Sequence, residues 1–230
     1  MLKWGNMRLA SLRPVDRRIG LSLLLATGFS LLLLVARILM TGRSTYAFLI
    51  WNLFLAWIPV VCAWLVSHTQ KPISAWKLVW IPAFLWLLFF PNSPYILTDL
   101  GHLARLSEWT LVPLGFDVVM ILTFTLSGLF LGFVSLFQME DVWRQHFRPS
   151  VTTALSLLSL ILAGFGVYLG RFLRWNSWDL FHRPGVLIQD LVTRVMDPVS
   201  YSRTWGFTAL YSGFLICIYL IVRLWRKRDV

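Results

Sequence analysis

The sequence predicts an all-α, polytopic membrane protein with six transmembrane helices and short interfacial helices on its outer face. Hydrophobic residues make up 58% of the 230 residues and charged residues only 13%, whereas soluble domains average about 45–50% and about 25%. The apolar residues also come in blocks of about 20, the length that a helix needs to cross about 30 Å of hydrocarbon. Disordered, collagen-like and disulfide-rich chains are thereby excluded, and a water-soluble domain is disfavoured.

Six apolar blocks are expected to cross the membrane as helices, because backbone polar groups inside lipid must be bonded within their own segment. Residues 1–230 would then form a single integral membrane domain. The expected spans cover residues 19–40, 46–66, 76–90, 111–138, 150–170 and 204–222.

The first three spans differ in the charged, polar and proline residues that lie in or beside them. The first is free of charge up to Arg37, and its apolar run is longer than that of a cleaved signal peptide, so we expect an anchor. The second is uncharged but contains Asn52. The third is followed by Pro91 and Pro94, and because proline lacks a backbone N–H, its helix is expected to stop near Phe90.

The last three spans carry a single charge, Asp117 in the fourth. Two pairs of glycines, 128 with 132 and 166 with 170, match the small-xxx-small pattern that permits close helix approach in lipid. Such matches also arise by chance in membrane sequences. Cys62 and Cys217 fall inside spans, where they are expected to be small packing residues.

The distribution of Lys and Arg predicts the orientation. With six spans both termini lie on one side, and that side carries 13 Lys and Arg residues against eight on the other. Because cytoplasmic loops carry the excess of basic residues, both termini are expected in the cytoplasm. The net charge of +11 is explained in this way, and no nucleic-acid partner is expected.

A short amphipathic helix is expected in the last outer loop. In GVLIQDLVTRVMDP, residues 185–198, a helical stripe is formed by Leu187, Ile188, Leu191, Val192 and Val195. The segment is too short and too polar to span, so it could lie in the outer leaflet. The alternative is a helix packed over the mouth of the bundle.

Two outer segments concentrate the polar residues that could carry chemistry. In PNSPYILTDLGHL, Thr98 could cap a short helix that presents Asp99, His102 and Arg105 on one side. The loop YLGRFLRWNSWDLFHRP repeats the acid-to-imidazole spacing of three residues with Asp179 and His182. It also places Arg171 and Arg174 one helical turn apart.

These two segments predict one outer cleft, lined by Asp99, His102, Arg171, Arg174 and Asp179. Two carboxylates and two imidazoles would suit a divalent metal such as zinc, with ligands drawn from Asp99, His102, Asp179 and His182. The two arginines could then hold an anionic substrate group, oriented by Asn92. The alternative is a structural network of ion pairs and hydrogen bonds.

Asp117 and the outer arginines each allow two interpretations. Asp117 could be a proton or cation site facing the bundle interior, since an unpaired charge within a span costs about 2.5 kcal/mol or more. It could instead pair with Arg171 or Arg174. All eight outer basic residues are Arg, which suits bidentate binding of a lipid phosphate or an anionic envelope substrate, and equally suits structural Asp–Arg pairing.

The same motifs carry a resemblance to a known family. PNSPYILTDLGHL, FDVVMILTFTLSGLFLGFVSLFQME and YLGRFLRWNSWDL resemble the bacterial membrane family catalogued as domain of unknown function 1361. The resemblance runs from about the second span to the sixth. It implies a multi-pass protein of the bacterial inner membrane, and it implies no substrate, cofactor or catalytic residue.

Three classes of function remain open from the sequence. Short loops and the absence of a P-loop, G-x-S-x-G, H-E-x-x-H or C-x-x-C motif favour an accessory or scaffold protein, with other membrane proteins as partners. The outer Asp, His, Arg and Asn residues favour an enzyme acting on a lipid-linked or cell-envelope substrate. A transporter is the third possibility, and interior polar residues crossing the bundle would support it.

Overall fold

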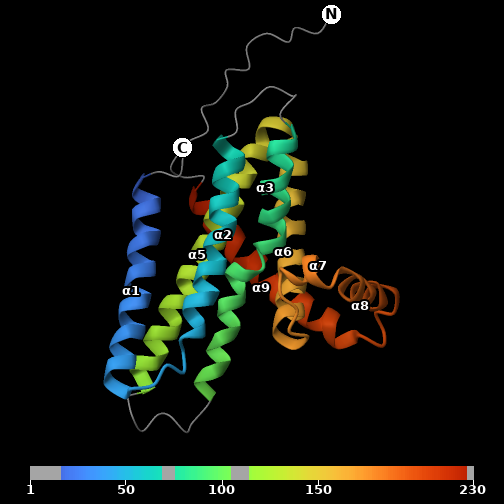
Figure 1. Cartoon of the computed structure of the whole chain (residues 1–230). Coiled ribbons are helices and arrows are strands. Elements are labelled where there is room, and N and C mark those ends of the chain that lie inside the picture. The colour runs from blue at the N-terminus through green and yellow to red at the C-terminus, as the bar shows by residue number, and fades with distance from the viewer. Residues whose placement is uncertain (1–16, 69–75, 105–113, 227–230) are drawn as a thin grey trace, which may run out of the picture.

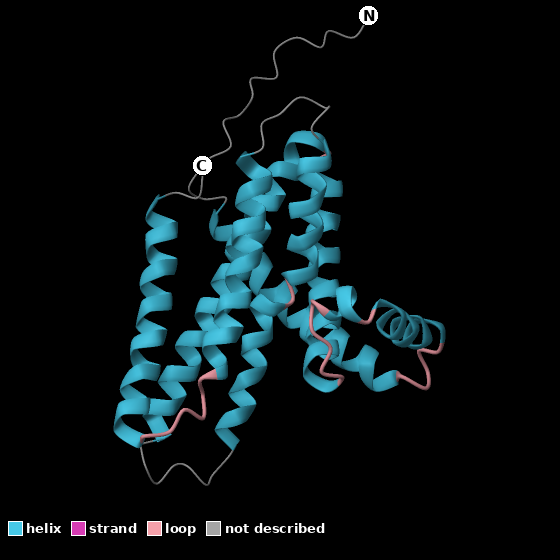
Figure 2. Ribbon diagram, in the orientation of Figure 1, coloured by secondary structure: helices cyan, strands magenta, loops and turns pink. Residues whose placement is uncertain are grey.

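A computed structural model describes residues 17–68, 76–104 and 114–226. Within these ranges the chain forms helices and no strand (Figure 2). The long helices are α1 (Arg17–Thr41), α2 (Phe48–His68), α3 (Trp76–Phe89), α5 (Leu114–His146), α6 (Pro149–Phe172) and α9 (Ser202–Arg226). Six helical segments of the described chain are long and apolar enough to cross a membrane, and the third of them, Val79–Leu103, runs on past the end of α3. The predicted all-α, six-span fold is confirmed.

The helix bounds differ from the predicted ones mainly where polar residues begin. Helix α3 ends at Phe89, next to the predicted stop at Phe90. Helix α5 continues to His146, well past the predicted residue 138. Its last turns contain Glu140 and Arg144, whose side chains lie 2.9 Å apart with the i, i+4 spacing of a helical ion pair. The apolar block ends where these polar residues begin, but the helix continues beyond it, so the predicted end came too early.

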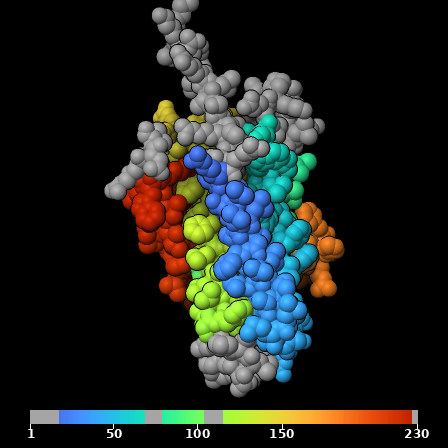
Figure 3. Space-filling model, turned by 90° about the vertical axis from the view of Figure 1, so that its left-hand side faces the viewer, coloured from blue at the N-terminus to red at the C-terminus, as the bar shows by residue number. Residues whose placement is uncertain are grey.

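Helix α5 lies at the centre of the bundle, where it contacts α1, α2 and α6 (Figure 1). Helix α1 lies at the surface against α5 (Figure 3). Several of its leucines are exposed. We call the end where α1 begins and α9 ends the terminal end. The other end, where α1 ends and α9 begins, is called the opposite end.

After α3 the chain turns into two short helices, α4 (Asn92–Tyr95) and η2 (Ile96–Ala104), the latter a 3₁₀ helix. Helix α4 lies between α5 and α6, and both glycine pairs face it. A Cβ atom on Gly128 would lie 2.7 Å from the Ser93 carbonyl oxygen, and one on Gly166 would lie 2.6 Å from Pro91 Cγ. Both small-xxx-small pairs therefore mark close approaches, each to the proline-containing segment rather than to another long helix.

The outer loop after α6 contains α7 (Asp179–His182) and α8 (Pro184–Met196). Figure 1 views α8 along its axis, so it lies across the direction of the spans. The predicted apolar stripe is divided: Leu187 is buried, whereas Ile188, Val192 and Val195 are exposed. Beyond α8, hydrogen bonds from the side chain and backbone N–H of Ser200 lower the pKa of Asp197.

Candidate functional site

The buried carboxylate of Asp99 is the centre of a polar cluster at the opposite end. Asp99 is only 1% exposed. Asn52 Nδ2 on α2 donates to Asp99 Oδ2 at 2.8 Å, and Arg171 Nη1 at the end of α6 lies 3.3 Å from Asp99 Oδ1. Three elements thus meet at one side chain. A buried charge with a counter-charge and a further hydrogen bond avoids most of its desolvation penalty.

His102 belongs to the same cluster. Its Nε2 atom lies 3.7 Å from Asp99 Oδ1 and 3.5 Å from Arg171 Nη1, and its ring packs against Phe48. The structure therefore brings together three of the predicted site residues. Thr98 does not cap this helix as predicted, because it lies inside η2 and donates to the Tyr95 carbonyl oxygen. Arg105 lies outside the described residues.

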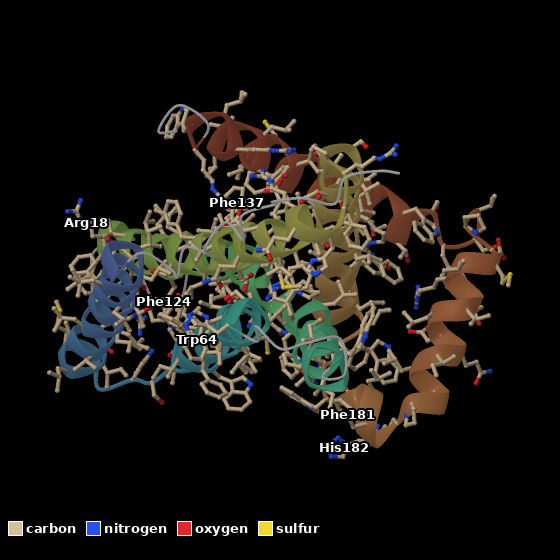
Figure 4. The ribbon with its side chains drawn as sticks, turned by 90° about the horizontal axis from the view of Figure 1, so that it is seen from above. Arg18, Trp64, Phe124, Phe137, Phe181 and His182 are labelled. Carbon is tan, nitrogen blue, oxygen red and sulfur yellow. The ribbon has the colours of Figure 1, made fainter. Side chains whose placement is uncertain are left out.

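Arg174, Asp179 and His182 line a different depression, an open groove of about 590 Å³. Asp179 Oδ2 accepts the backbone N–H of Asn176 at 2.7 Å, and His182 Nδ1 lies 3.0 Å from the Trp178 carbonyl oxygen. Figure 4 shows His182 at the edge of the molecule, pointing away from the bundle. The residues predicted to line one outer cleft therefore lie in two separate places. Asp99 and His102 point from η2 toward the interior of the protein, whereas Asp179 and His182 point outward from α7.

This division bears directly on the metal hypothesis. Within the described ranges, no group of three or more His, Cys, Asp or Glu side chains is placed to hold a metal ion. Asp99 and His102 are engaged with Arg171, while Asp179 and His182 bond to their own loop. A four-ligand zinc site therefore finds no support in the geometry.

Asp117 pairs with a residue that the sequence did not indicate. Arg37 Nε on α1 donates to Asp117 Oδ1 at 2.7 Å, and Arg37 Nη2 lies 3.3 Å from Oδ2. Both side chains are 1% exposed. The Arg37 guanidinium lies over the Tyr46 ring, with Cζ 4.3 Å from the ring centroid. The prediction of pairing with Arg171 or Arg174 was wrong, because α1 packs on α5 and places Arg37 opposite the carboxylate.

A second depression, of about 460 Å³, lies beside the Asp99 cluster between α2, α3, α6 and α8. We call it the cleft. Most of its lining is apolar, and the polar side chains are Asn52, Asn92, Asn176 and Ser177. Asn92 Nδ2 donates to Ser177 Oγ at 3.0 Å, which ties α4 to the loop before α7. Asn52 reaches the cleft while it also bonds to Asp99.

A comparison with family models identifies the family of the chain. The model described as "Protein of unknown function (DUF1361)" matches residues 51–218. The chain belongs to this family. No curated protein and no solved structure matches it in the corresponding comparisons.

The DUF1361 match includes every residue of the cleft and the Asp99 cluster, but it begins after α1. Arg37 therefore lies outside the matched range although its partner Asp117 lies inside. The resemblance read from the motifs is confirmed. The family description gives no activity.

The sequence reasoning missed two features of this DUF1361 protein. The first is the role of Asn52, which lines the cleft and donates to Asp99; its place inside a span was the available signal, since polar residues within spans are often functional. Glu140, near the terminal end, is fully buried, and its Oε1 atom lies 2.9 Å from Arg144, 3.3 Å from Arg223 and 3.2 Å from the Tyr219 hydroxyl. The i, i+4 spacing of Glu140 and Arg144 was the available signal.

Proposed function

We propose that this DUF1361 protein is an accessory protein of the bacterial inner membrane that binds an amphipathic molecule, a lipid or a lipid-linked envelope intermediate, in the cleft. A volume of about 460 Å³ falls within the usual range of small-molecule sites, roughly 300–1,000 Å³. Its apolar lining suits hydrocarbon chains. The cleft is the observation on which the proposal depends.

The position of the cleft supports entry of a ligand from the bilayer. Trp51, Phe84 and Leu87 line it and are also exposed. Exposed apolar residues on membrane-spanning helices face lipid, so a ligand could reach the cleft sideways without crossing water. The second N–H of the Asn52 amide could donate to an ester, sugar or phosphate oxygen. Asn92 donates both of its N–H groups to Phe89 and Ser177, so its Oδ1 atom could accept from a sugar hydroxyl.

An enzyme acting on a lipid-linked substrate is the alternative. Its candidate acid–base pair would be Asp99 and His102, which lie 3.7 Å apart. Neither residue lines the cleft, and Arg171 contacts both. The pairing with Arg171 and Asn52 suits a structural role that fixes Asn52 at the cleft wall, so binding is favoured over catalysis.

Filling the cleft tests the binding proposal. Leu162 lines the cleft, whereas Leu158 lies one helical turn away on the lipid-facing surface of α6 and does not. In proteoliposomes with a photoactivatable phospholipid, we expect labelling of peptides from α2, α3 and α6. Leu162→Trp should reduce this labelling several-fold, and Leu158→Trp should leave it unchanged. Labelling spread evenly over all six spans would contradict the proposal.

The proposed orientation places both termini in the cytoplasm, from the excess of basic residues at the terminal end. A reporter fused after Val230 should then be active in the cytoplasm. An epitope tag inserted within residues 183–203 should be accessible from outside intact spheroplasts. A C-terminal reporter that is active only outside the cytoplasm would overturn this orientation.

A further inference from the structure

The groove beside the cleft holds two arginines. Arg174 and Arg183 both line it and are exposed. In the part of the chain that the structure describes, neither guanidinium forms an ion pair. Other arginines at the same end behave differently: Arg37, Arg171 and Arg194 pair with Asp117, Asp99 and Asp190.

The arginines at this end therefore form two groups: those that form ion pairs within the protein, and those whose guanidinium groups are available to a ligand. The paired arginines join α1 to α5, join α6 to η2, and hold α8 together through an i, i+4 pair. Arg174 and Arg183 make no such connection. The acidic residue of the groove, Asp179, accepts the backbone N–H of Asn176. That bond orients the carboxylate toward the loop, and two arginines against one aspartate leave the groove with a net positive charge.

The backbone at Arg174 adds a second observation. Its φ angle is +60°, in the left-handed region. Helix α6 ends at Phe172, just before Arg174, and the N–H of Trp175 donates back to the Leu169 carbonyl oxygen at 3.1 Å. Glycine normally occupies this position because it adopts a positive φ without strain. Arg174 therefore occupies a position that is strained for a residue with a side chain, and it lines the groove there.

The groove and the cleft are neighbours with a shared wall. Trp175 and Asn176 line both. Trp175 is held in place by its Nε1 atom, which donates to Asp190 Oδ2 on α8 at 2.9 Å. Trp178, on the groove side, packs edge-on against Trp51 on the cleft side. One molecule could therefore occupy both places, with its apolar part in the cleft and its polar part in the groove.

We infer that the groove binds the phosphate-bearing, anionic headgroup of the molecule whose apolar part lies in the cleft; this rests on the proposed function. The guanidinium group presents a planar fork of donors that matches phosphate bidentately. Arg174 and Arg183 supply two such forks, and His182 lies between them in sequence along the groove. The ligand class is accordingly an anionic phospholipid or a lipid-linked phosphate, not a zwitterionic lipid.

Binding of defined lipids to the purified full chain in detergent, measured by native mass spectrometry, tests this inference. The probes are phosphatidylglycerol, phosphatidylcholine and inorganic phosphate. Arg174→Gln/Arg183→Gln should weaken phosphatidylglycerol binding at least about tenfold, the scale of a lost charge-assisted hydrogen bond. The charge-matched control is Arg43→Gln/Arg203→Gln, which removes two exposed arginines at the same end, outside the groove. It should change the affinity less than about threefold.

The outcomes separate the two proposals. Equal weakening by both double variants, or no preference for phosphatidylglycerol over phosphatidylcholine, would overturn the headgroup site. If Leu162→Trp still blocks lipid labelling in that case, the cleft stands without the groove. Binding of inorganic phosphate that depends on Arg174 and Arg183, with no lipid preference, would also overturn the inference, since it would identify a site for free phosphate. A thermal unfolding midpoint unchanged in the double variant would confirm that the loss is not one of folding.

Discussion

Asp117→Asn is expected to lower the free energy of unfolding by about 3–5 kcal/mol, because it leaves the guanidinium of Arg37 buried without its counter-charge. The two side chains are 1% exposed and joined by bonds of 2.7 Å and 3.3 Å. The pair also connects α1, which lies outside the DUF1361 match, to the central helix α5. Loss of the pair should therefore loosen α1 first. Unfolding in mixed micelles, followed by protease accessibility of α1, measures both effects.

A double variant provides the control for this prediction. Arg37→Met/Asp117→Leu removes both charges and replaces them with apolar side chains. Because a buried ion pair recovers little more than its own desolvation cost, this variant should be close to the natural protein in stability. A single variant as stable as the natural protein would show that the pair is not structural. Loss of a proton or cation flux at normal folded yield would instead support the transport interpretation of Asp117.

Alanine at Gly128 or Gly166 is expected to destabilise the protein by about 1–3 kcal/mol, the usual cost of overpacking a filled interior. The added Cβ atom would lie 2.7 Å from the Ser93 carbonyl oxygen in the first case and 2.6 Å from Pro91 Cγ in the second. Both neighbours belong to the rigid turn around α4, and the backbone there cannot move aside easily. Thermal unfolding in detergent would measure the loss.

Two other glycines serve as matched controls. Gly28 on α1 and Gly213 on α9 also lie inside long helices, but a Cβ atom on either would meet nothing within 4 Å. Alanine there should raise stability by about 0.5–1 kcal/mol, because glycine loses more conformational freedom in a helix. The opposite signs at the two kinds of position distinguish packing from helix propensity. Destabilisation of equal size at all four sites would contradict the proposed role of α4.

The predicted and observed structures agree wherever the governing property is local. Six apolar blocks of sufficient length predict six helices, since a helix satisfies its own backbone in lipid whatever it packs against. Pro91 and Pro94 predict the end of α3, which the structure places at Phe89. The amphipathic period of residues 185–198 predicts α8, which the structure places at Pro184–Met196. Each of these follows from residues within a few turns of one another.

The candidate site was predicted only in its residue types and partly in its grouping. Asp99, His102 and Arg171 do meet, as expected from two loops at the same end of the bundle. Arg174, Asp179 and His182 lie instead in the groove. Spacing alone cannot distinguish these cases, because it does not show whether a short helix turns its polar face inward or outward.

What the sequence determined by itself was therefore the all-α membrane fold, its helices and the end at which the polar side chains gather. Tertiary structure alone decided which charges pair: Asp117 had eight outer arginines to choose from, and the packing of α1 on α5 selected Arg37. It also decided where the cleft lies, since helices from α2 to α8, far apart in the sequence, form its walls. The physical reason is the same in both cases. Helix formation depends on bonds within one segment, whereas ion pairs and cavities depend on which segments become neighbours.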